Sequence, residues 1–302
     1  MEKIVIESND AGQRLDRFLN KKFPALPSSR MQRAIREKKI KINRKRAQPS
    51  DRLQAGDTIE LFLAPDLLLK KNRIPPKTPE LKIVYEDEHM LVAFKPAGLL
   101  SQKESVNDTD TLQDRLLYNL FKRGLYDPEG SFTPAICHRL DRNTAGLVLC
   151  AKDAQTQRLA NEDIAEHRLH KYYLARVMGR PQTGKISVYL KKDQNRALIS
   201  DEPREGYVPA NLIIESLQTD PEGKDICTAE IELLTGRFHQ IRATLAHLGH
   251  ILEGDHKYGY QGPCKTQQLC AWKLDLSDCT FDRGVDVVSL DSEAIFPIRV
   301  ED

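Results

Sequence analysis

One short stretch of this 302-residue chain places a carboxylate where it could do chemistry. Residues 138–147 read HRLDRNTAGL, so Asp141 stands just before turn-forming residues. Its sequence neighbours include Arg139 and Arg142, and nearby cations favour the ionised form of a carboxylate. An ordinary turn aspartate with a surface ion pair is the alternative. The stretch alone therefore leaves both a reactive and a structural role open.

The segments on either side of Asp141 predict strands that would position it. Residues 134–141, PAICHRLD, are typical of a strand that leads into a turn, and residues 147–152, LVLCAK, are typical of the next strand. Side chains two apart on a strand share a face, so we expect Arg139 and Asp141 to point the same way. Asp141 is thus predicted at a strand end, where functional residues are common.

The chain from residue 81 onward predicts an α+β fold. Residues 81–100 should form a hairpin that ends in a Lys-Pro-Ala-Gly turn. A helix is expected from Asp153, a suitable N-cap, to near Leu169, and another within residues 237–249. Strands without regular helical crossovers favour a mixed, largely antiparallel sheet. Further strands are predicted at residues 171–179, 207–217 and 226–234.

The first 73 residues are strongly basic. They hold 18 Lys and Arg against 9 Asp and Glu, a charge of +9, whereas the remainder carries −7. Apolar residues at helical spacing predict one helix within residues 12–23, and a second helix should begin near Pro27. Nine basic residues and one acid lie between Arg30 and Arg46. Such a run is often a solvated surface, but its continuation from helix into turn favours phosphate binding.

The order of elements in residues 12–63 resembles the alpha-L RNA-binding domain, which is named for a small-subunit ribosomal protein. Lys39 and Arg44 stand where that family usually has turn glycines, so the shapes of these turns stay open. The resemblance and the charge predict a small basic α/β RNA-binding domain in residues 1–72. A Pro-rich linker is expected at 66–80, before a second domain at 81–302. The residues expected to contact RNA in the first domain are Arg30, Arg33, Arg36, Lys45 and Arg46.

Four segments of the second domain carry a further resemblance. Residues 138–152 are similar to the signature HRLD-x-x-T-[SA]-G-L, and KYYLARV (171–177) to K-x-Y-x-A-x-V. LLTGRFHQIR (233–242) is similar to L-x-T-G-R-x-H-Q-I-R, and LCAWKL (269–274) resembles a late L-H-A-x-x-L segment. With these segments the chain resembles the RluA-type RNA pseudouridine synthases. The resemblance implies a catalytic domain of the pseudouridine synthase type that isomerises uridine to pseudouridine in RNA.

The resemblance implies roles for five residues. Asp141 would be the catalytic carboxylate and Arg242 its ion-pair partner. Tyr173 would pack on the uracil and help to remove the C5 proton, and Leu269 would give the base an apolar wall. Arg139 would enter the RNA stack as the uridine leaves it. Without the resemblance, Arg242 is an exposed helix arginine, Leu269 is core, and Arg139 is a charge neighbour of Asp141.

The implied reaction sets the expected cofactors and partners. A single carboxylate can act as a nucleophile or stabilise positive charge at the ribose, and the sequence leaves both routes open. Because the product is an isomer, we expect no redox cofactor, no nucleotide cofactor and no metal. The expected partner is RNA, with large-subunit (23S-type) ribosomal RNA as the usual class for this arrangement and transfer RNA as an open alternative. We expect the enzyme to act as a monomer.

Composition limits the other possibilities. No run approaches the roughly 18 apolar residues of a spanning helix, so no membrane role is expected. The start, MEKIVIESND, is too charged for a secretory signal, and six scattered cysteines suit reduced thiols, so we expect a cytoplasmic location.

Two rival functions stay open. Four histidines (His239, His247, His250 and His256) could suggest a metallohydrolase, but no H-E-x-x-H spacing is present. A non-catalytic ribosome-binding protein is the second rival, and the presence of Asp141, Tyr173 and Arg242 argues against it.

Overall fold

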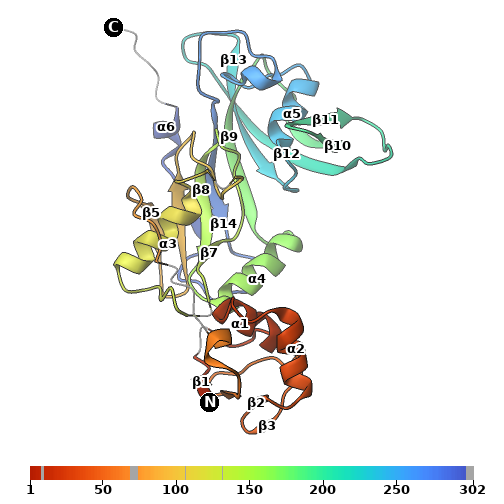
Figure 1. Ribbon diagram of the computed structural model, residues 1–302. Coiled ribbons are helices and arrows are strands. Elements are labelled where there is room, and N and C mark those ends of the chain that lie inside the picture. The colour runs from red at the N-terminus through yellow and green to blue at the C-terminus, as the bar shows by residue number, and fades with distance from the viewer. Residues whose placement is uncertain (8–9, 69–73, 106, 131, 297–302) are drawn as a thin grey trace.

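The computed structural model describes residues 1–7, 10–68, 74–105, 107–130 and 132–296. Two separate sheets organise these residues. Figure 1 shows the small N-terminal sheet and its helices beyond α4 (Ala154–Ala165), at one end of a much larger sheet. No helix in the described part of the chain is long and apolar enough to cross a membrane.

The N-terminal helices lie where the spacing of apolar residues predicts them. Helix α1 spans Leu15–Lys22 and helix α2 spans Ser28–Arg36. Their apolar faces share one buried cluster with the sheet, because residues three and four apart line one side of a helix. The sheet has the order β1-β4-β2-β3, and its strands are β1 (Glu2–Val5), β4 (Thr58–Leu61), β2 (Ile40–Ile42) and β3 (Lys45–Arg46).

Two turns of this domain use the left-handed conformation without glycine. Arg44, which replaces a family glycine, has φ 64° and follows Asn43 at φ 50°. At the end of α2 the left-handed residue is Lys38, with φ 59°, rather than Lys39. The left-handed residue of this turn therefore lies one position before Lys39, where the family usually has a glycine. Residues other than glycine, Asn, Asp and His are uncommon in this region of backbone space.

The segment between the sheets has little regular structure in its described residues. A short 3-10 helix, η2, spans Pro65–Leu68, residues 69–73 lie outside the described part, and residues 74–80 form neither helix nor strand. Residues 74–80 contain three prolines, and these account for the absence of helix and strand there.

The large sheet has eleven strands and is antiparallel except for one pair, β14 with β8. Its order is β11-β10-β12-β13-β9-β14-β8-β6-β5. In addition, β15 pairs with β14, and β7 pairs with β8. The strands are β5 (Lys82–Glu86), β6 (Met90–Lys95), β7 (Ala135–Ile136), β8 (Ala145–Ala151), β9 (His170–Met178), β10 (Gly184–Asp193), β11 (Arg196–Ser200), β12 (Val208–Thr219), β13 (Ile226–Leu233), β14 (Leu269–Asp275) and β15 (Val287–Ser289).

Helices bury both faces of the central strands. Helix α3 (Leu112–Lys122) and helix α5 (Gln240–His247) contribute to the core on one face, and α4 contributes to the core on the other. Alternate residues of β6 and β8 enter the two cores, as the two-residue repeat of a strand requires. The α+β class and the mixed, largely antiparallel sheet are confirmed. Two short elements complete the domain: η3 (His256–Tyr258) and α6 (Ser292–Ile295).

The sequence prediction was wrong in three places. The strand before Asp141 ends at Ile136, so residues 137–141 are irregular and Arg139 and Asp141 do not alternate on a strand. Helix α4 begins after Asp153, whose side chain caps it as predicted, but it ends at Ala165. Helix α3 and the β10–β11 hairpin were not predicted. Alternate residues of β10 (Ile186, Val188 and Leu190) are apolar and pack in a core cluster, but charged residues at both ends of the strand keep this alternation short.

Candidate active site

Three neighbouring strands bring the predicted site residues together. Strand β14 lies between β8 and β9, parallel to β8 and antiparallel to β9. Because parallel strands begin at the same edge, Leu269 at the start of β14 lies near the loop that leads into β8. That loop carries Asp141. Strand β9 places Tyr173 opposite Ala271, beside the same edge.

Gly146 makes this parallel pairing possible. It has φ 130°, and a Cβ built on it would lie 2.3 Å from the carbonyl oxygen of Ala271. Any side chain would therefore push β8 and β14 apart. The glycine of the TAG segment thus fixes the distance between the loop of Asp141 and the strand of Leu269.

The loop of Asp141 is held from both sides by residues 95–101. Lys95 is fully buried at the end of β6, and its ammonium group donates to the carbonyl oxygens of Leu99 at 2.8 Å and Arg142 at 3.0 Å. Burial lowers the pKa of Lys95 to about 8, and Asp141 opposes this change. Ser101 Oγ donates to the carbonyl of Leu140 at 2.7 Å and accepts its N–H at 3.1 Å. These bonds set the irregular backbone around Asp141.

A chain of ion pairs fixes the carboxylate. Arg242, only 6% exposed, donates from Nη1 to Asp141 Oδ2 at 3.1 Å. Its other face makes a bidentate pair with buried Asp255, at 2.7 Å from Nε and 2.9 Å from Nη2. Burial, the largest effect, lowers the pKa of Arg242, but the two carboxylates outweigh it and the net pKa is raised. A bidentate pair fixes the plane of a guanidinium, so Asp255 aims Arg242 at Asp141.

The electrostatics of Asp141 differ from the sequence-based expectation. Burial raises its pKa, and although Arg242 and Lys95 lower it, the net pKa is above the ordinary value for an aspartate. The cations that lower the pKa most are Arg242 and Lys95, which are distant in sequence, and burial outweighs them. Neighbouring Arg142 instead donates from Nε to the carbonyl of Gly98 at 3.2 Å.

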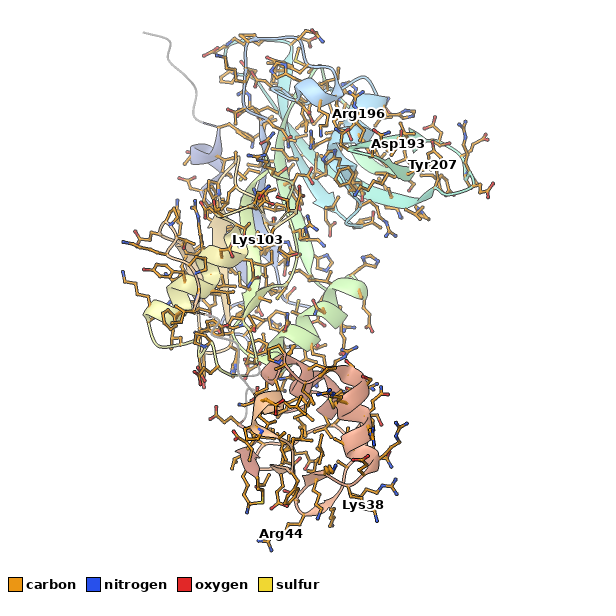
Figure 2. The ribbon with its side chains drawn as sticks, viewed as in Figure 1. Lys38, Arg44, Lys103, Asp193, Arg196 and Tyr207 are labelled. Carbon is orange, nitrogen blue, oxygen red and sulfur yellow. The ribbon has the colours of Figure 1, made fainter. Side chains whose placement is uncertain are left out.

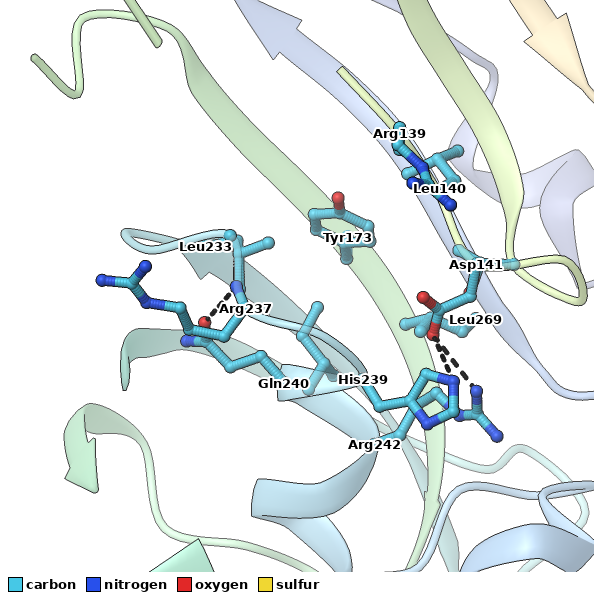
Figure 3. A pocket seen from close by; sticks show the side chains of 13 residues that line it. Arg139, Leu140, Asp141, Tyr173, Leu233, Arg237, His239, Gln240, Arg242 and Leu269 are labelled. Atoms are coloured by element: carbon cyan, nitrogen blue, oxygen red, sulfur yellow. Dashed lines mark hydrogen bonds and ion pairs between the residues drawn. The ribbon is translucent and has the colours of Figure 1, made fainter. Parts of the chain in front are cut away.

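Asp141 lies at a pocket whose apolar wall comes from the strands (Figure 3). The pocket is lined by Tyr173 from β9, Leu233 from β13 and Leu269 from β14. The ring of Tyr173 is buried, and burial, with the charge of Asp141, raises its pKa above the ordinary value. The phenol is therefore protonated near neutral pH. An apolar wall with one carboxylate at its edge suits a flat, uncharged ring.

Comparison with known proteins identifies the family. A family model described as RNA pseudouridylate synthase matches residues 89–247, more than half of the chain, and the S4 domain matches residues 13–59. The chain belongs to the RNA pseudouridylate synthase family. It is an RNA pseudouridine synthase with an N-terminal S4 domain, so the predicted enzyme class, fold and RNA partner are confirmed.

Named relatives cover most of the chain. Ribosomal large subunit pseudouridine synthase D of Xylella fastidiosa is 31% identical over 255 residues, which are 82% of this chain and 72% of that protein. Ribosomal large subunit pseudouridine synthase C of Escherichia coli is 30% identical over 280 residues, 85% of this chain and 79% of that protein. The solved structure of human RNA Pseudouridylate Synthase Domain Containing 4 is 20% identical with a TM-score of 0.53, covers 67% of this chain and 89% of that chain, and shows the shared fold.

Arg139 of this pseudouridine synthase lies on the exposed rim of the pocket. Its side chain is 59% exposed, and its ion-pair partner is Glu104, at 3.5 Å from Nη2. No ion pair joins Arg139 to Asp141 among the described residues. The alternative of an exposed helix arginine is wrong for Arg242, which is buried. Leu269 is both buried in the core and part of the pocket lining, so the side chain fits both of the roles considered for it.

Four residues near the pocket were not predicted as site residues. Lys95 and Asp255 position Arg142 and Arg242, and Gln240 Oε1 accepts from the N–H of Arg237 at 3.0 Å and so closes the turn before α5. His239 Nε2 lies 3.7 Å from Asp141 Oδ2. The Lys-Pro-Ala-Gly turn and the Gly-Asp pair at 254–255 were signals for Lys95 and Asp255 in the sequence. Nothing in the sequence pattern showed that Lys95 contacts the loop of Asp141 or that Asp255 pairs with Arg242.

The basic residues of the S4 domain lie on a different surface. Arg30, Arg33 and Arg36 are exposed on α2, and Lys45 and Arg46 are exposed on β3. Figure 2 shows Lys38 and Arg44 at the outer end of this domain, far from Lys103, which lines the wider groove that also contains Arg139 and Asp141. The two sets of cations therefore do not form one continuous local patch.

The described residues contain no group of three or more His, Cys, Asp or Glu side chains that could hold a metal. Three of the four histidines that suggested a metallohydrolase have separate structural partners. His247 contacts Asp201, His250 contacts the carbonyl of Met178, and His256 contacts the carbonyls of Tyr260 and Cys264. The histidines thus do not support the metallohydrolase alternative.

Proposed function

We propose that this enzyme isomerises specific uridines in large-subunit ribosomal RNA and that Asp141 is its catalytic carboxylate. The observation that carries this proposal is the placement of Asp141. One carboxylate oxygen pairs with buried Arg242 at 3.1 Å, at the edge of a pocket walled by Tyr173. The relatives named above act, by their names, on the large ribosomal subunit, and this supports the choice of RNA.

The residues divide the reaction as follows. The bond between ribose C1′ and uracil N1 breaks, the base rotates, and a bond forms between C1′ and C5, while the C5 proton is lost and N1 gains a proton. Ionised Asp141 either attacks C1′ or stabilises the positive charge that develops there. Tyr173 packs on the ring of the base. Its raised pKa keeps the phenol protonated, so packing fits Tyr173 better than proton removal as a phenolate.

Two further regions would hold the RNA. Arg139 on the pocket rim is the residue proposed to fill the stack when the uridine leaves it, because a planar guanidinium can replace a base. The S4 domain, proposed to span residues 1–72 and to be joined through 66–80 to the catalytic domain at 81–302, would contact phosphates. The residues proposed for those contacts are Arg30, Arg33, Arg36, Lys45 and Arg46. We propose that the enzyme is a cytoplasmic monomer.

The test is chemical mapping of pseudouridine in total RNA from cells with the gene, without it, and with Asp141→Asn in its place. We expect defined large-subunit positions to lose pseudouridine without the gene and to regain it only with the wild-type protein. Loss confined to transfer RNA would refute the choice of RNA. Restoration by Asp141→Asn would refute the catalytic role and favour a protein that acts by binding alone.

A further inference from the structure

His239 has a left-handed backbone conformation at the start of a helix that its side chain does not cap. It precedes α5 in the left-handed region, with φ 53° and ψ 25°, and it occupies the N-cap position without making a side-chain cap bond. Asn would tolerate this conformation and would also cap the helix. Non-glycine residues held in such conformations cluster at functional sites. The imidazole is instead turned away from the helix end and toward Asp141.

The imidazole is held in place on three sides. It is 8% exposed and stacks on Phe238 with ring centroids 3.8 Å apart and an angle of 19°. Nδ1 lies 3.0 Å from the hydroxyl oxygen of Tyr258 in η3. Nε2 faces Asp141 Oδ2 at 3.7 Å (Figure 3). One ring nitrogen is therefore hydrogen-bonded to Tyr258, and the other is directed at the carboxylate.

The hydrogen bonds of Tyr258 indicate which nitrogen carries the proton. The N–H of Ala197 in β11 donates to the Tyr258 oxygen at 2.8 Å. Burial raises the pKa of Tyr258, so its hydroxyl keeps a proton, and Nδ1 of His239 is the acceptor within reach. Burial, and then the charge of Arg242, lower the pKa of His239 to about 3, so the ring is neutral near pH 7. A neutral ring that accepts at Nδ1 must carry its proton on Nε2.

We infer that His239 is a positioning residue that directs its Nε2–H at Asp141 and, together with Arg242, selects which carboxylate oxygen reacts. Both side chains address Oδ2, at 3.7 Å and 3.1 Å. Oδ1 has no protein partner among the described residues and is left to face the ribose. The 3.7 Å separation shortens to a hydrogen bond when RNA fills the pocket, since catalytic contacts are often long in unliganded enzymes. This inference rests on the proposed catalytic role of Asp141.

The relay also connects the β10–β11 hairpin to the site. It runs from the Ala197 backbone through Tyr258 and His239 to Asp141. Lys192 of β10 lies 4.8 Å from the ring centroid of Phe238, on which His239 stacks. A shift of the hairpin would therefore alter the position of His239 through Tyr258 and through Phe238, and so its contact with Asp141.

Two substitutions of His239 separate positioning from structure. In His239→Gln the side-chain amide N–H can occupy the place of Nε2–H, whereas Asn is too short to reach Asp141 but suits the left-handed N-cap. We expect the single-turnover rate of His239→Asn to fall by about tenfold or more, with Gln nearer to wild type and RNA affinity unchanged in both. A structural role predicts the opposite order, with Asn the more active and the more stable variant.

The tautomer provides a readout that does not depend on turnover. In ¹⁵N-labelled full-length enzyme, His239 should show a non-protonated Nδ1 and a protonated Nε2 at neutral pH. Tyr258→Phe removes the donor to Nδ1, and we expect a mixture of tautomers and a single-turnover rate several-fold lower, with unchanged RNA affinity. A protonated Nδ1 in the wild type, or a fully active Tyr258→Phe enzyme with wild-type tautomer, would overturn the inference.

The outcome for Asp141 is read separately. If Asp141→Asn abolishes turnover while His239→Asn is as active as wild type, only the positioning role fails. If Asp141→Asn is active, the proposed catalytic role fails regardless of His239.

Discussion

The cations of the S4 domain and the cations of the catalytic pocket differ in burial and in partners. Arg30, Arg33 and Arg36 are exposed, and Arg33 pairs at the surface with Glu37, the residue that follows α2. Lys95 and Arg242 are buried, and each contacts several fixed acceptors. Exposed pairs contribute little and are screened by salt, whereas removing one partner of a buried pair leaves an uncompensated charge.

This difference predicts two kinds of response. At the pocket, each charged residue has one geometry, so a single substitution should have a large effect on the chemical step. On the S4 domain, the charges should act together and depend on salt, and any one of them should be replaceable.

The largest effect is expected from Arg242→Ala. The substitution removes the partner of Asp141 and leaves Asp255 buried without its cation. We expect the single-turnover rate to fall by about 10²–10³, the loss typical of one electrostatic group at an active site. The matched control is Arg168→Ala, since Arg168 also pairs with a buried aspartate, Asp163, outside the pocket. The control should lower thermal stability and leave the rate near wild type; similar losses of rate in both would mean that Arg242 acts through stability alone.

The pH dependence follows from the raised pKa of Asp141. Ionised Asp141 is needed, so the single-turnover rate at subsaturating enzyme should fall as pH drops through a pKa above the ordinary value of about 3.9. Arg242 lowers this pKa, so Arg242→Gln should move the acid limb to higher pH. A limb at or below the ordinary aspartate value in the wild type would contradict the burial that the structure shows.

Arg139 should show an intermediate effect that depends on the substrate. Arg139→Ala should slow reaction of a uridine held in a stem by about tenfold, because extrusion there costs a few kcal/mol, and should affect an unpaired uridine less. Rates are compared on two RNAs that differ only in the pairing of the target. Lys103→Ala, on the same groove, is the matched control for a general loss of positive charge. Equal losses on both RNAs would remove the extrusion role.

The smallest effect on chemistry is expected from the S4 domain. The combined variant Arg30→Gln, Arg33→Gln, Arg36→Gln should bind structured RNA more weakly and reduce the slope of log K against log salt by about 2–3. The rate at saturating enzyme should be unchanged. Exposed lysines outside this domain, Lys77, Lys122 and Lys185, give a control variant of equal charge change. An unchanged slope would show that α2 does not contact the RNA.

The sequence predicted those features that depend on local pattern. Amphipathic spacing located α1 and α2, and Asp153 marked the start of α4. The family segments placed Arg242 near Asp141, although they are far apart in the chain. These features need only neighbouring residues or a long specific motif.

Other features depend on contacts between distant segments. The loop of Asp141 was predicted as a strand because its shape is set by Lys95 and Ser101, which lie outside that segment. The net rise in the pKa of Asp141 could not be predicted from its sequence neighbours, because burial depends on the packing of the whole pocket. The left-handed His239 and its bond to Tyr258 follow from the meeting of α5 with η3.

The account assigns the chemistry to the pocket of Asp141 and RNA affinity to the S4 domain. The most direct test is to measure two quantities on Asp141→Asn and on the triple arginine variant of α2. The quantities are the single-turnover rate of pseudouridine formation at saturating enzyme and the affinity for the same RNA. Asp141→Asn should keep the fold and the affinity while turnover is abolished, and the triple variant should keep the rate while affinity falls. Turnover within a few fold of wild type in folded Asp141→Asn would contradict the assignment of the chemistry to this pocket.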